Sequence, residues 1–133
     1  MLVPAPILAQ LRAHAAAAHP LECCGLLLGE GDQIIAAQSA ANVHPSPQTH
    51  FEIDPAALIA AHRAARAGGP QVIGYYHSHP HGPPDPSATD QAHAAGDGRI
   101  WAIIGTGIGA GEIRFWRDAQ SGFERLSCAT ANS

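Results

Sequence analysis

The stretch QVIGYYHSHPHGPPDPSATD, residues 71–90, combines a predicted strand, a rigid loop and the start of a helix. Residues 71–79 are rich in β-branched and aromatic side chains and are followed directly by a proline, so they predict a strand. The proline-rich segment 80–86 can neither continue a strand nor form a helix interior, and it predicts a stiff loop. Ser87 then opens a helix that we expect to end at Gly96.

Three side chains of this stretch predict a metal site. Because side chains alternate between the two faces of a strand, His77 and His79 share a face. Ser87 and Asp90 share a face on the first turn of the following helix. The loop can therefore bring Asp90 back toward the two histidines. Two imidazoles and a carboxylate leave a fourth position for water, which a catalytic zinc requires. The sequence therefore predicts one zinc ion per chain, bound by His77, His79 and Asp90.

A purely structural hypothesis also fits part of this pattern. Ser-x-x-Asp before an apolar helical segment is close to a capping box, with Ser87 as N-cap and Asp90 near the positive end of the helix dipole. A His-x-His pair is a weak signal in a chain with nine histidines. The combination favours the metal site, because a helix cap does not require the histidines. His81 and Asp85 are alternative ligands, disfavoured because they lie beyond the end of the strand.

Glu22 is the only charged residue in the apolar stretch 20–29, which predicts a strand over about 22–29. A charge that enters a buried strand is costly unless it is paired or functional. One hypothesis is an exposed glutamate at the end of a strand. The other is the carboxylate that a zinc hydrolase needs to take the proton from its water. The neighbouring metal pattern favours the second hypothesis, in which Glu22 is the general base.

Together these residues resemble the signature of the JAMM metalloproteases, the catalytically competent MPN domains. Glu22 and the run His-x-His-x(7)-Ser-x-x-Asp over 77–90 match that signature, and the resemblance extends from about Ile7 to Trp116. It is closest to the small stand-alone bacterial and archaeal members. The resemblance implies that the two histidines and the aspartate bind zinc and that Glu22 is the catalytic acid/base. It also implies that Ser87 hydrogen-bonds the reacting oxygen.

For function, the resemblance implies hydrolysis of a peptide or isopeptide bond after the C-terminal Gly-Gly tail of a ubiquitin-like or sulfur-carrier protein. Such a tail can lie extended along a sheet edge and enter a narrow cleft. The chain is too short for the large insertions with which eukaryotic relatives hold a second ubiquitin. Two other hypotheses remain open: a non-catalytic MPN scaffold, which predicts the loss of a ligand or of the glutamate, and a DNA-repair-associated relative, which predicts a basic surface.

Length and composition predict a small enzyme. We expect 133 residues to form a single domain, 1–133, with one packed core. A net charge of −4 without any lysine argues against a nucleic-acid surface. No apolar run has the length of a membrane span, and the first residues lack the features of a secretory signal, so a cytoplasmic location is expected. Three cysteines predict buried free thiols rather than a disulfide framework.

Periodicity predicts an α/β sandwich with a mixed sheet, because helical and strand patterns are interspersed. The resemblance implies the cytidine deaminase-like three-layer fold of JAMM domains. The glycine-rich segment 105–111 is predicted to be a hairpin connection rather than a phosphate loop, because no helix follows it. His14 and His19 are expected on the solvent side or near the end of the first helix. The predicted helices cover about 7–18, 54–68 and 87–95, and the predicted strands about 22–29, 33–39, 50–53, 71–79, 99–105, 112–117 and 123–127.

Overall fold

A six-stranded mixed sheet forms the centre of the computed structural model, which describes residues 1–106 and 111–131. Its strand order is β3-β2-β4-β5-β6-β7. The strands are β2 (Cys24–Glu30), β3 (Gln33–Ala40), β4 (Gln71–His79), β5 (Ile100–Gly105), β6 (Ile113–Ala119) and β7 (Gly122–Leu126). β4 and β5 are parallel, and the other neighbours are antiparallel. A separate parallel pair joins β1 (Leu2–Pro4) to β8 (Ala129–Ala131).

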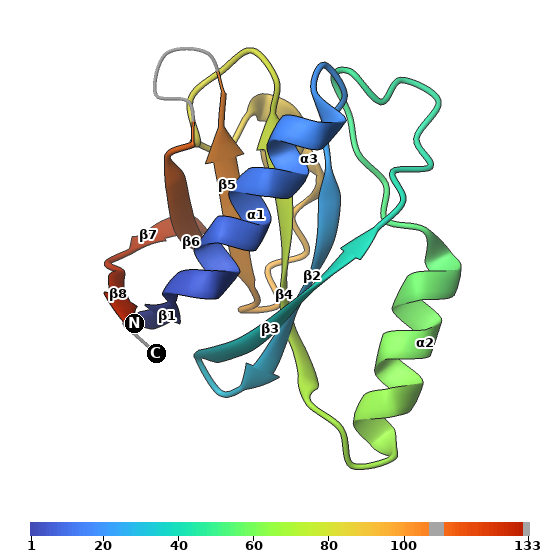
Figure 1. Ribbon diagram of the computed structural model, residues 1–133, viewed down its shortest axis with the longest axis vertical. Coiled ribbons are helices and arrows are strands. Elements are labelled where there is room, and N and C mark those ends of the chain that lie inside the picture. Colours follow the sequence, from blue (N-terminus) through green and yellow to red (C-terminus); the bar gives the residue numbers. More distant parts are fainter. Residues whose placement is uncertain (107–110, 132–133) are drawn as a thin grey trace.

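Two helices cover opposite faces of this sheet, α1 (Ala5–Ala18) and α2 (Pro55–Arg66) (Figure 1). Successive strand residues point to different cores: Leu27 of β2 packs with the α1 side, and its neighbour Leu26 packs with the α2 side. α1 buries the apolar stripe Ile7, Leu11 and Ala15, as its periodicity predicts. The predicted three-layer α/β sandwich is therefore confirmed.

The connection from β4 to β5 determines where the functional residues meet. These strands are parallel, so the chain must cross back between them, and it does so through the proline-rich loop and the short helix α3 (Ala88–His93). The crossover places the first turn of α3 beside the carboxyl end of β4, which carries His77 and His79. Crevices at the carboxyl ends of parallel strands are common ligand sites in α/β proteins.

Several predicted boundaries are wrong, each for an identifiable reason. β2 begins at Cys24 rather than at residue 22, because the Glu22 N–H donates to the Pro47 carbonyl instead of to a strand neighbour. The short strand predicted over 50–53 is reduced to one bridge between Asn42 and Ile53. α3 ends at His93 rather than near residue 95. The backbone N–H groups of residues 95 and 96 donate to the Asp118 carboxylate instead of to helix carbonyls. β1 and β8 were not predicted. They lie near opposite ends of the sequence and pair with each other, so neither has a local sequence signal.

Other expectations concern single side chains and segments. The three cysteines are free thiols as predicted, but Cys128 is exposed rather than buried. His14, expected on the solvent side of the first helix, also contacts the interior, because its Nδ1 lies 2.7 Å from the hydroxyl of the buried Tyr76. The predicted hairpin connection over 105–111 includes residues 107–110, which lie outside the described residues. Among the helices described, none has both the length and the apolar character needed to cross a membrane.

Candidate metal centre

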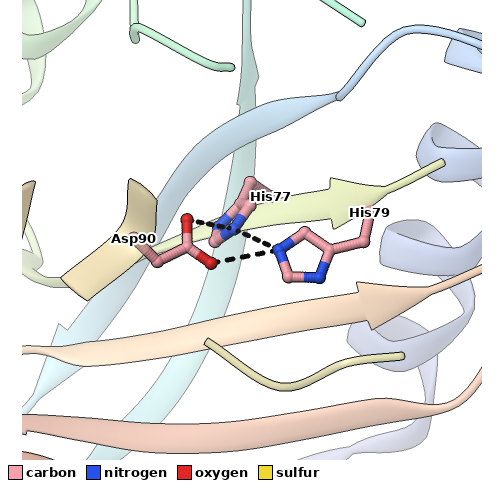
Figure 2. A group of neighbouring side chains, drawn as sticks. All are labelled: His77, His79 and Asp90. Carbon is pink, nitrogen blue, oxygen red and sulfur yellow. Dashed lines mark hydrogen bonds and ion pairs between the residues drawn. The ribbon is translucent and has the colours of Figure 1, made fainter. Parts of the chain in front are cut away.

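Two strand residues and one helix residue converge at the carboxyl end of β4, as Figure 2 shows. His77 Nε2 and His79 Nε2 lie 3.2 Å apart. Asp90 Oδ1 lies 3.1 Å from His77 Nε2, and Asp90 Oδ2 lies 3.0 Å from His79 Nε2. In the described part of the chain, these three residues are the only group of histidine, cysteine, aspartate or glutamate side chains with metal-binding spacing. The structure thus brings together the three side chains that the sequence predicts as ligands.

The spacing of the three groups fits a tetrahedral cation. Atoms bound to zinc at about 2.0–2.1 Å stand roughly 3.3 Å apart when the geometry is tetrahedral. The observed separations of 3.0, 3.1 and 3.2 Å are close to that value. Neutral imidazole nitrogens and a carboxylate are also the donor set that zinc prefers. The residues present therefore fit a zinc ion with three protein ligands.

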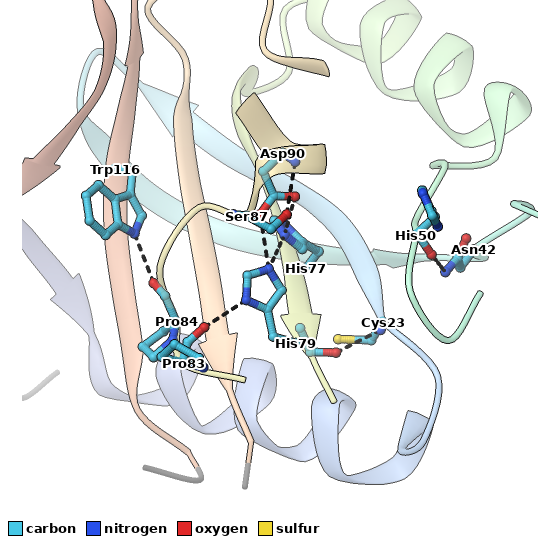
Figure 3. Close-up of polar contacts among 11 residues, drawn as sticks. Cys23, Asn42, His50, His77, His79, Pro83, Pro84, Ser87, Asp90 and Trp116 are labelled. Atoms are coloured by element: carbon cyan, nitrogen blue, oxygen red, sulfur yellow. Dashed lines mark hydrogen bonds and ion pairs between the residues drawn. The ribbon is translucent and has the colours of Figure 1, made fainter. Parts of the chain in front are cut away.

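The proline-rich loop orients His79. Its Nδ1 lies 2.8 Å from the Pro83 carbonyl oxygen, which can only accept, so Nδ1 carries the hydrogen and Nε2 faces Asp90. The Trp116 indole N–H donates to the next carbonyl of the loop, that of Pro84, at 3.1 Å (Figure 3). Thr106 donates its hydroxyl to the His79 carbonyl. Ring and backbone of His79 are therefore both held in place by hydrogen bonds.

Aromatic rings orient His77. The imidazole is fully buried and stacks on Phe51, with ring centroids 4.2 Å apart and an interplanar angle of 18°. The Trp101 ring meets it edge-on, with centroids 5.7 Å apart. His77 Nδ1 is buried and has no hydrogen-bond partner among the described residues. On the Nδ1 side packing rather than a hydrogen bond therefore holds this ring, whereas its Nε2 meets Asp90.

Ser87 and Asp90 form the capping box that the structural hypothesis predicts, and Asp90 also reaches the histidines. The Asp90 N–H donates to Ser87 Oγ at 3.0 Å, and the Ser87 N–H donates to Asp90 Oδ2 at 2.9 Å. The cap fixes the aspartate side chain at the start of α3, where it meets His77 and His79. The two hypotheses are therefore compatible, because the cap helps to build the site.

Charge in the site is concentrated on the carboxylate. Burial would raise the pKa of Asp90, but hydrogen bonds with both histidines outweigh it and hold that pKa well below its usual range. Burial lowers the pKa of His77. For His79 burial acts in the same direction, yet the hydrogen bonds to Asp90 and Pro83 and the negative charges of Asp90 and Glu22 together outweigh it and raise the pKa. An ionised aspartate beside two imidazoles is an electrostatically favourable place for a divalent cation.

Glu22 lies beside this group, just before β2. Its side chain is 7% exposed and lines both hollows that adjoin the site. Burial raises its pKa to about 7, with a smaller opposing effect from His79. A carboxyl group with such a pKa can exchange a proton near neutral pH, which a general base requires. The structure thus gives Glu22 a buried place at the site rather than the exposed strand end of the alternative hypothesis.

Two hollows meet at the site and share Glu22, Thr49 and Thr89. One is a cavity of about 220 Å³ whose apolar wall is formed by Phe51, Ile53, Leu58, Tyr75 and Trp101. The other is a groove bordered by His79, the proline-rich loop and Ser87. Together they provide room for an extended chain on both sides of Glu22 and the three predicted ligands.

Sequence reasoning missed three residues that support the site. Ser78, buried between the two histidines, accepts from the Cys23 N–H at 2.9 Å. Phe51 stacks on His77, and Asn42 bonds to the backbone of Glu22. Only Ser78 could have been suspected from the sequence, because it lies between the two histidines in His-Ser-His. The contacts of the other two span many residues, so the local pattern could not reveal them.

The alternative ligands are placed elsewhere. Asp85 is paired with the guanidinium of Arg114. His81 packs edge-on against His19, with ring centroids 5.6 Å apart. Neither belongs to the metal-binding group found among the described residues. The structure therefore disfavours both as ligands, as the sequence analysis expected.

Comparison with known proteins gives consistent similarities. The sequence pattern of a family described as prokaryotic homologs of the JAB domain matches residues 4–119. A desampylase from Haloferax volcanii is 37% identical over 99 residues, covering 73% of this chain and 71% of that protein. A probable TtuB-protein conjugate cleaving protease from Thermus thermophilus is 40% identical over 92 residues, covering 68% of this chain and 60% of that protein.

Solved structures show the same fold. A protein from Desulfitobacterium hafniense superposes with a TM-score of 0.85 at 26% identity, covering 99% of this chain and 93% of that one. A JAB1/MPN domain protein from Archaeoglobus fulgidus gives a TM-score of 0.66 at 20% identity, covering 99% of this chain and 100% of that one. The α/β sandwich seen here is thus shared with a JAB1/MPN domain.

Proposed function

Because this chain belongs to the family of prokaryotic homologs of the JAB domain, we propose that it is a zinc metallopeptidase of the JAMM type, a deubiquitinase-like isopeptidase. The resemblance inferred from the sequence is confirmed at the level of the family. The proposed reaction is hydrolysis of a peptide or isopeptide bond after the C-terminal Gly-Gly tail of a ubiquitin-like or sulfur-carrier protein.

The observation that carries this proposal is the separation of 3.0–3.2 Å among His77 Nε2, His79 Nε2 and the Asp90 carboxylate, with the buried Glu22 beside them. In the proposal the two histidines and the aspartate hold one zinc ion. When bound in such a site, zinc lowers the pKa of a water ligand to about 7 and polarises a carbonyl group.

Glu22 is proposed to move the protons. It would accept a proton from the attacking water and deliver it to the nitrogen of the leaving amine. Its pKa of about 7, raised by burial, suits both halves of this task, because the group can be deprotonated before attack and protonated afterwards. Among the hydrogen bonds of the described residues none uses the Glu22 carboxylate, so it is free for this role.

Ser87 is proposed to stabilise the reacting oxygen. Its Oγ already accepts the Asp90 N–H, but the hydroxyl hydrogen is not used in that bond and can be donated. A donor that points at an oxygen on which negative charge develops typically speeds such reactions by one hundred- to one thousandfold. The exposed position of Ser87 on the groove is compatible with contact to a substrate.

The substrate class is inferred from the relatives and from the shape of the site. One relative is named as a desampylase and another as a TtuB-protein conjugate cleaving protease. The hollows on either side of Glu22 suit a thin, extended chain, and a glycine-terminated tail presents no side chains to the narrow passage. We infer a protein conjugate joined through such a tail as the substrate.

The proposal extends to the organisation of the chain. We infer that residues 1–133 act as a single domain and that the enzyme works in the cytoplasm. Free thiols at Cys23, Cys24 and Cys128 are typical of a reducing compartment. A non-catalytic scaffold is the less favoured function, since Glu22 and all three predicted ligands lie together.

The test is a cleavage assay with a Gly-Gly-ended carrier protein fused to a short peptide. Zinc-loaded protein should release the peptide, and a chelator should stop release until zinc is restored. Glu22→Gln should retain zinc but lose most turnover, since the amide cannot take the proton. Glu52→Gln is the matched control, because Glu52 borders the same cavity but is exposed. Full turnover by metal-loaded Glu22→Gln protein would remove Glu22 from the proposed role.

A further inference from the structure

Asn42 makes four hydrogen bonds, which use both donors and both acceptor positions of its amide. Its Nδ2 donates to the Glu22 carbonyl at 3.0 Å and to the His50 carbonyl at 2.9 Å. Its Oδ1 accepts from the N–H groups of His44 and Glu52, both at 3.1 Å. Figure 3 shows the bond to His50 at the side of the site. One side chain thus joins both sides of the loop 43–52 to the backbone of Glu22.

The backbone of Glu22 is held from both sides by this region of the chain. The Glu22 N–H donates to the Pro47 carbonyl at 2.8 Å, and its carbonyl accepts from Asn42. On the other side, the Cys23 N–H donates to Ser78 Oγ at 2.9 Å, and the Ser78 N–H donates to the Cys23 carbonyl at 3.1 Å. The segment is therefore clamped between the loop and β4, although it precedes β2.

The side chain of Glu22 depends on this clamp. Among the hydrogen bonds of the described residues, none involves the Glu22 carboxylate, so no side-chain partner fixes its position. Its place at the meeting point of the two hollows is set by its own backbone. A general base must stand within hydrogen-bond reach of the proton that it takes, and small displacements reduce the rate strongly.

We propose that Asn42 is a positioning residue that fixes Glu22 at the site by holding its carbonyl group to the loop 43–52. The inference rests on the proposed function, in which Glu22 is the base. The same loop carries Phe51, which stacks on His77.

The two halves of the amide allow a sharp test. The acceptor half bonds within the loop, to residues 44 and 52, whereas the donor half reaches Glu22 and His50. Asn42→Asp keeps the acceptors and loses the donors, and Asn42→Ala removes both without adding charge. Arg117→Ala is the matched control, because Arg117 also donates to two segments, at Gly98 and Asp32, remote from Glu22.

The experiment measures kcat, KM and zinc content of the zinc-loaded variants with the carrier–peptide fusion. Both Asn42 variants should lose kcat by about ten- to one hundredfold, as expected for a displaced catalytic group. KM should stay within about twofold and zinc content should not change, because Asn42 contacts none of the predicted ligands. In a Glu22→Gln background, Asn42→Asp should cause no further loss of kcat.

A second measurement does not depend on activity. Amide hydrogen exchange at Glu22 should accelerate at least tenfold in both Asn42 variants, while exchange within β2 and β4 stays unchanged. Wild-type kcat in either folded variant, or an equal loss in Arg117→Ala, would overturn the proposal. If wild-type protein cleaves no conjugate, the proposed function fails. The exchange measurement then still decides the structural inference, and unchanged exchange at Glu22 would overturn it.

Discussion

At the scale of single residues, the Asp90 carboxylate serves two purposes. Ser87 Oγ and the Asp90 carboxylate close a capping box, and the same carboxylate meets both histidines. Glu22 is different, because its carboxylate has a raised pKa and no hydrogen-bond partner among the described residues. The effects of capping, metal binding and proton transfer can therefore be separated by substitutions at these positions.

Substitutions of Ser87 should separate the cap from the hydroxyl. Ser87→Ala loses the acceptor for the Asp90 N–H and should lower the unfolding free energy by about 1 kcal/mol. Ser87→Asn can restore the acceptor but has no hydroxyl, so it should recover stability while remaining at least tenfold slower in cleavage. Ser87→Thr should recover both. Chemical denaturation and the cleavage assay give the two readouts, and full activity in Ser87→Asn would exclude the hydroxyl from the reaction.

Glu22 should make the stability of metal-free protein depend on pH. A carboxyl pKa of about 7 in the folded protein lies above the unfolded value of 4.5, so the folded state prefers the protonated form. That stability is present below pH 4.5 and is lost as pH rises through about 7. In chelator at pH 8, Glu22→Gln should therefore exceed wild type by roughly 2 kcal/mol, and near pH 4.5 the two should be equal. If wild type and Glu22→Gln had equal thermal unfolding temperatures at pH 8 as well as near pH 4.5, this expectation would be contradicted.

At the scale of elements, the site depends on three segments that approach β4 from different parts of the chain. α3 supplies Asp90, the segment just before β2 supplies Glu22, and the loop before α2 supplies Phe51. The contact of Phe51 with His77 is apolar, yet it sets the orientation of a predicted ligand whose Nδ1 has no described partner. Groups that orient metal ligands commonly change metal affinity by ten- to one hundredfold when they are removed.

Phe51→Ala should weaken zinc binding by about tenfold, because His77 loses the ring on which it stacks. Competition titration with a coloured zinc chelator measures the change. Phe123→Ala is the matched control: Phe123 packs on Trp101, with ring centroids 4.9 Å apart, and Trp101 remains in place beside His77. Equal zinc affinity in wild type and Phe51→Ala would show that the stack does not position the ligand.

At the scale of the whole molecule, the predicted ligands join two elements that are separated by the proline-rich loop. A zinc ion held by His77, His79 and Asp90 would tie β4 to α3 and add binding free energy to folding. The net charge of −4 and the convergence of the acidic and imidazole groups in one crevice are compatible with cation binding there.

Zinc at one hundred times its dissociation constant should raise the unfolding free energy by about 2.7 kcal/mol, or the unfolding temperature by roughly 8 °C. A chelator should reverse the change. His77→Ala should abolish the shift, whereas His81→Ala should preserve it, because His81 lies outside the metal-binding group. Differential scanning calorimetry measures both. A full shift in His77→Ala would show that zinc binds elsewhere.

Local pattern alone predicted the sandwich and brought forward the three candidate ligands. Alternation along β4 puts His77 and His79 on one face, and the local Ser-x-x-Asp pattern favours the start of a helix at Ser87. The pairing of β1 with β8 had no such signal, because three-residue strands at opposite ends of the chain form only when the rest has folded. Tertiary structure alone also decided the support of the site. Phe51 on His77, Asn42 on Glu22 and the position of Glu22 outside β2 arise from long-range contacts, which leave no periodicity in the residues that make them.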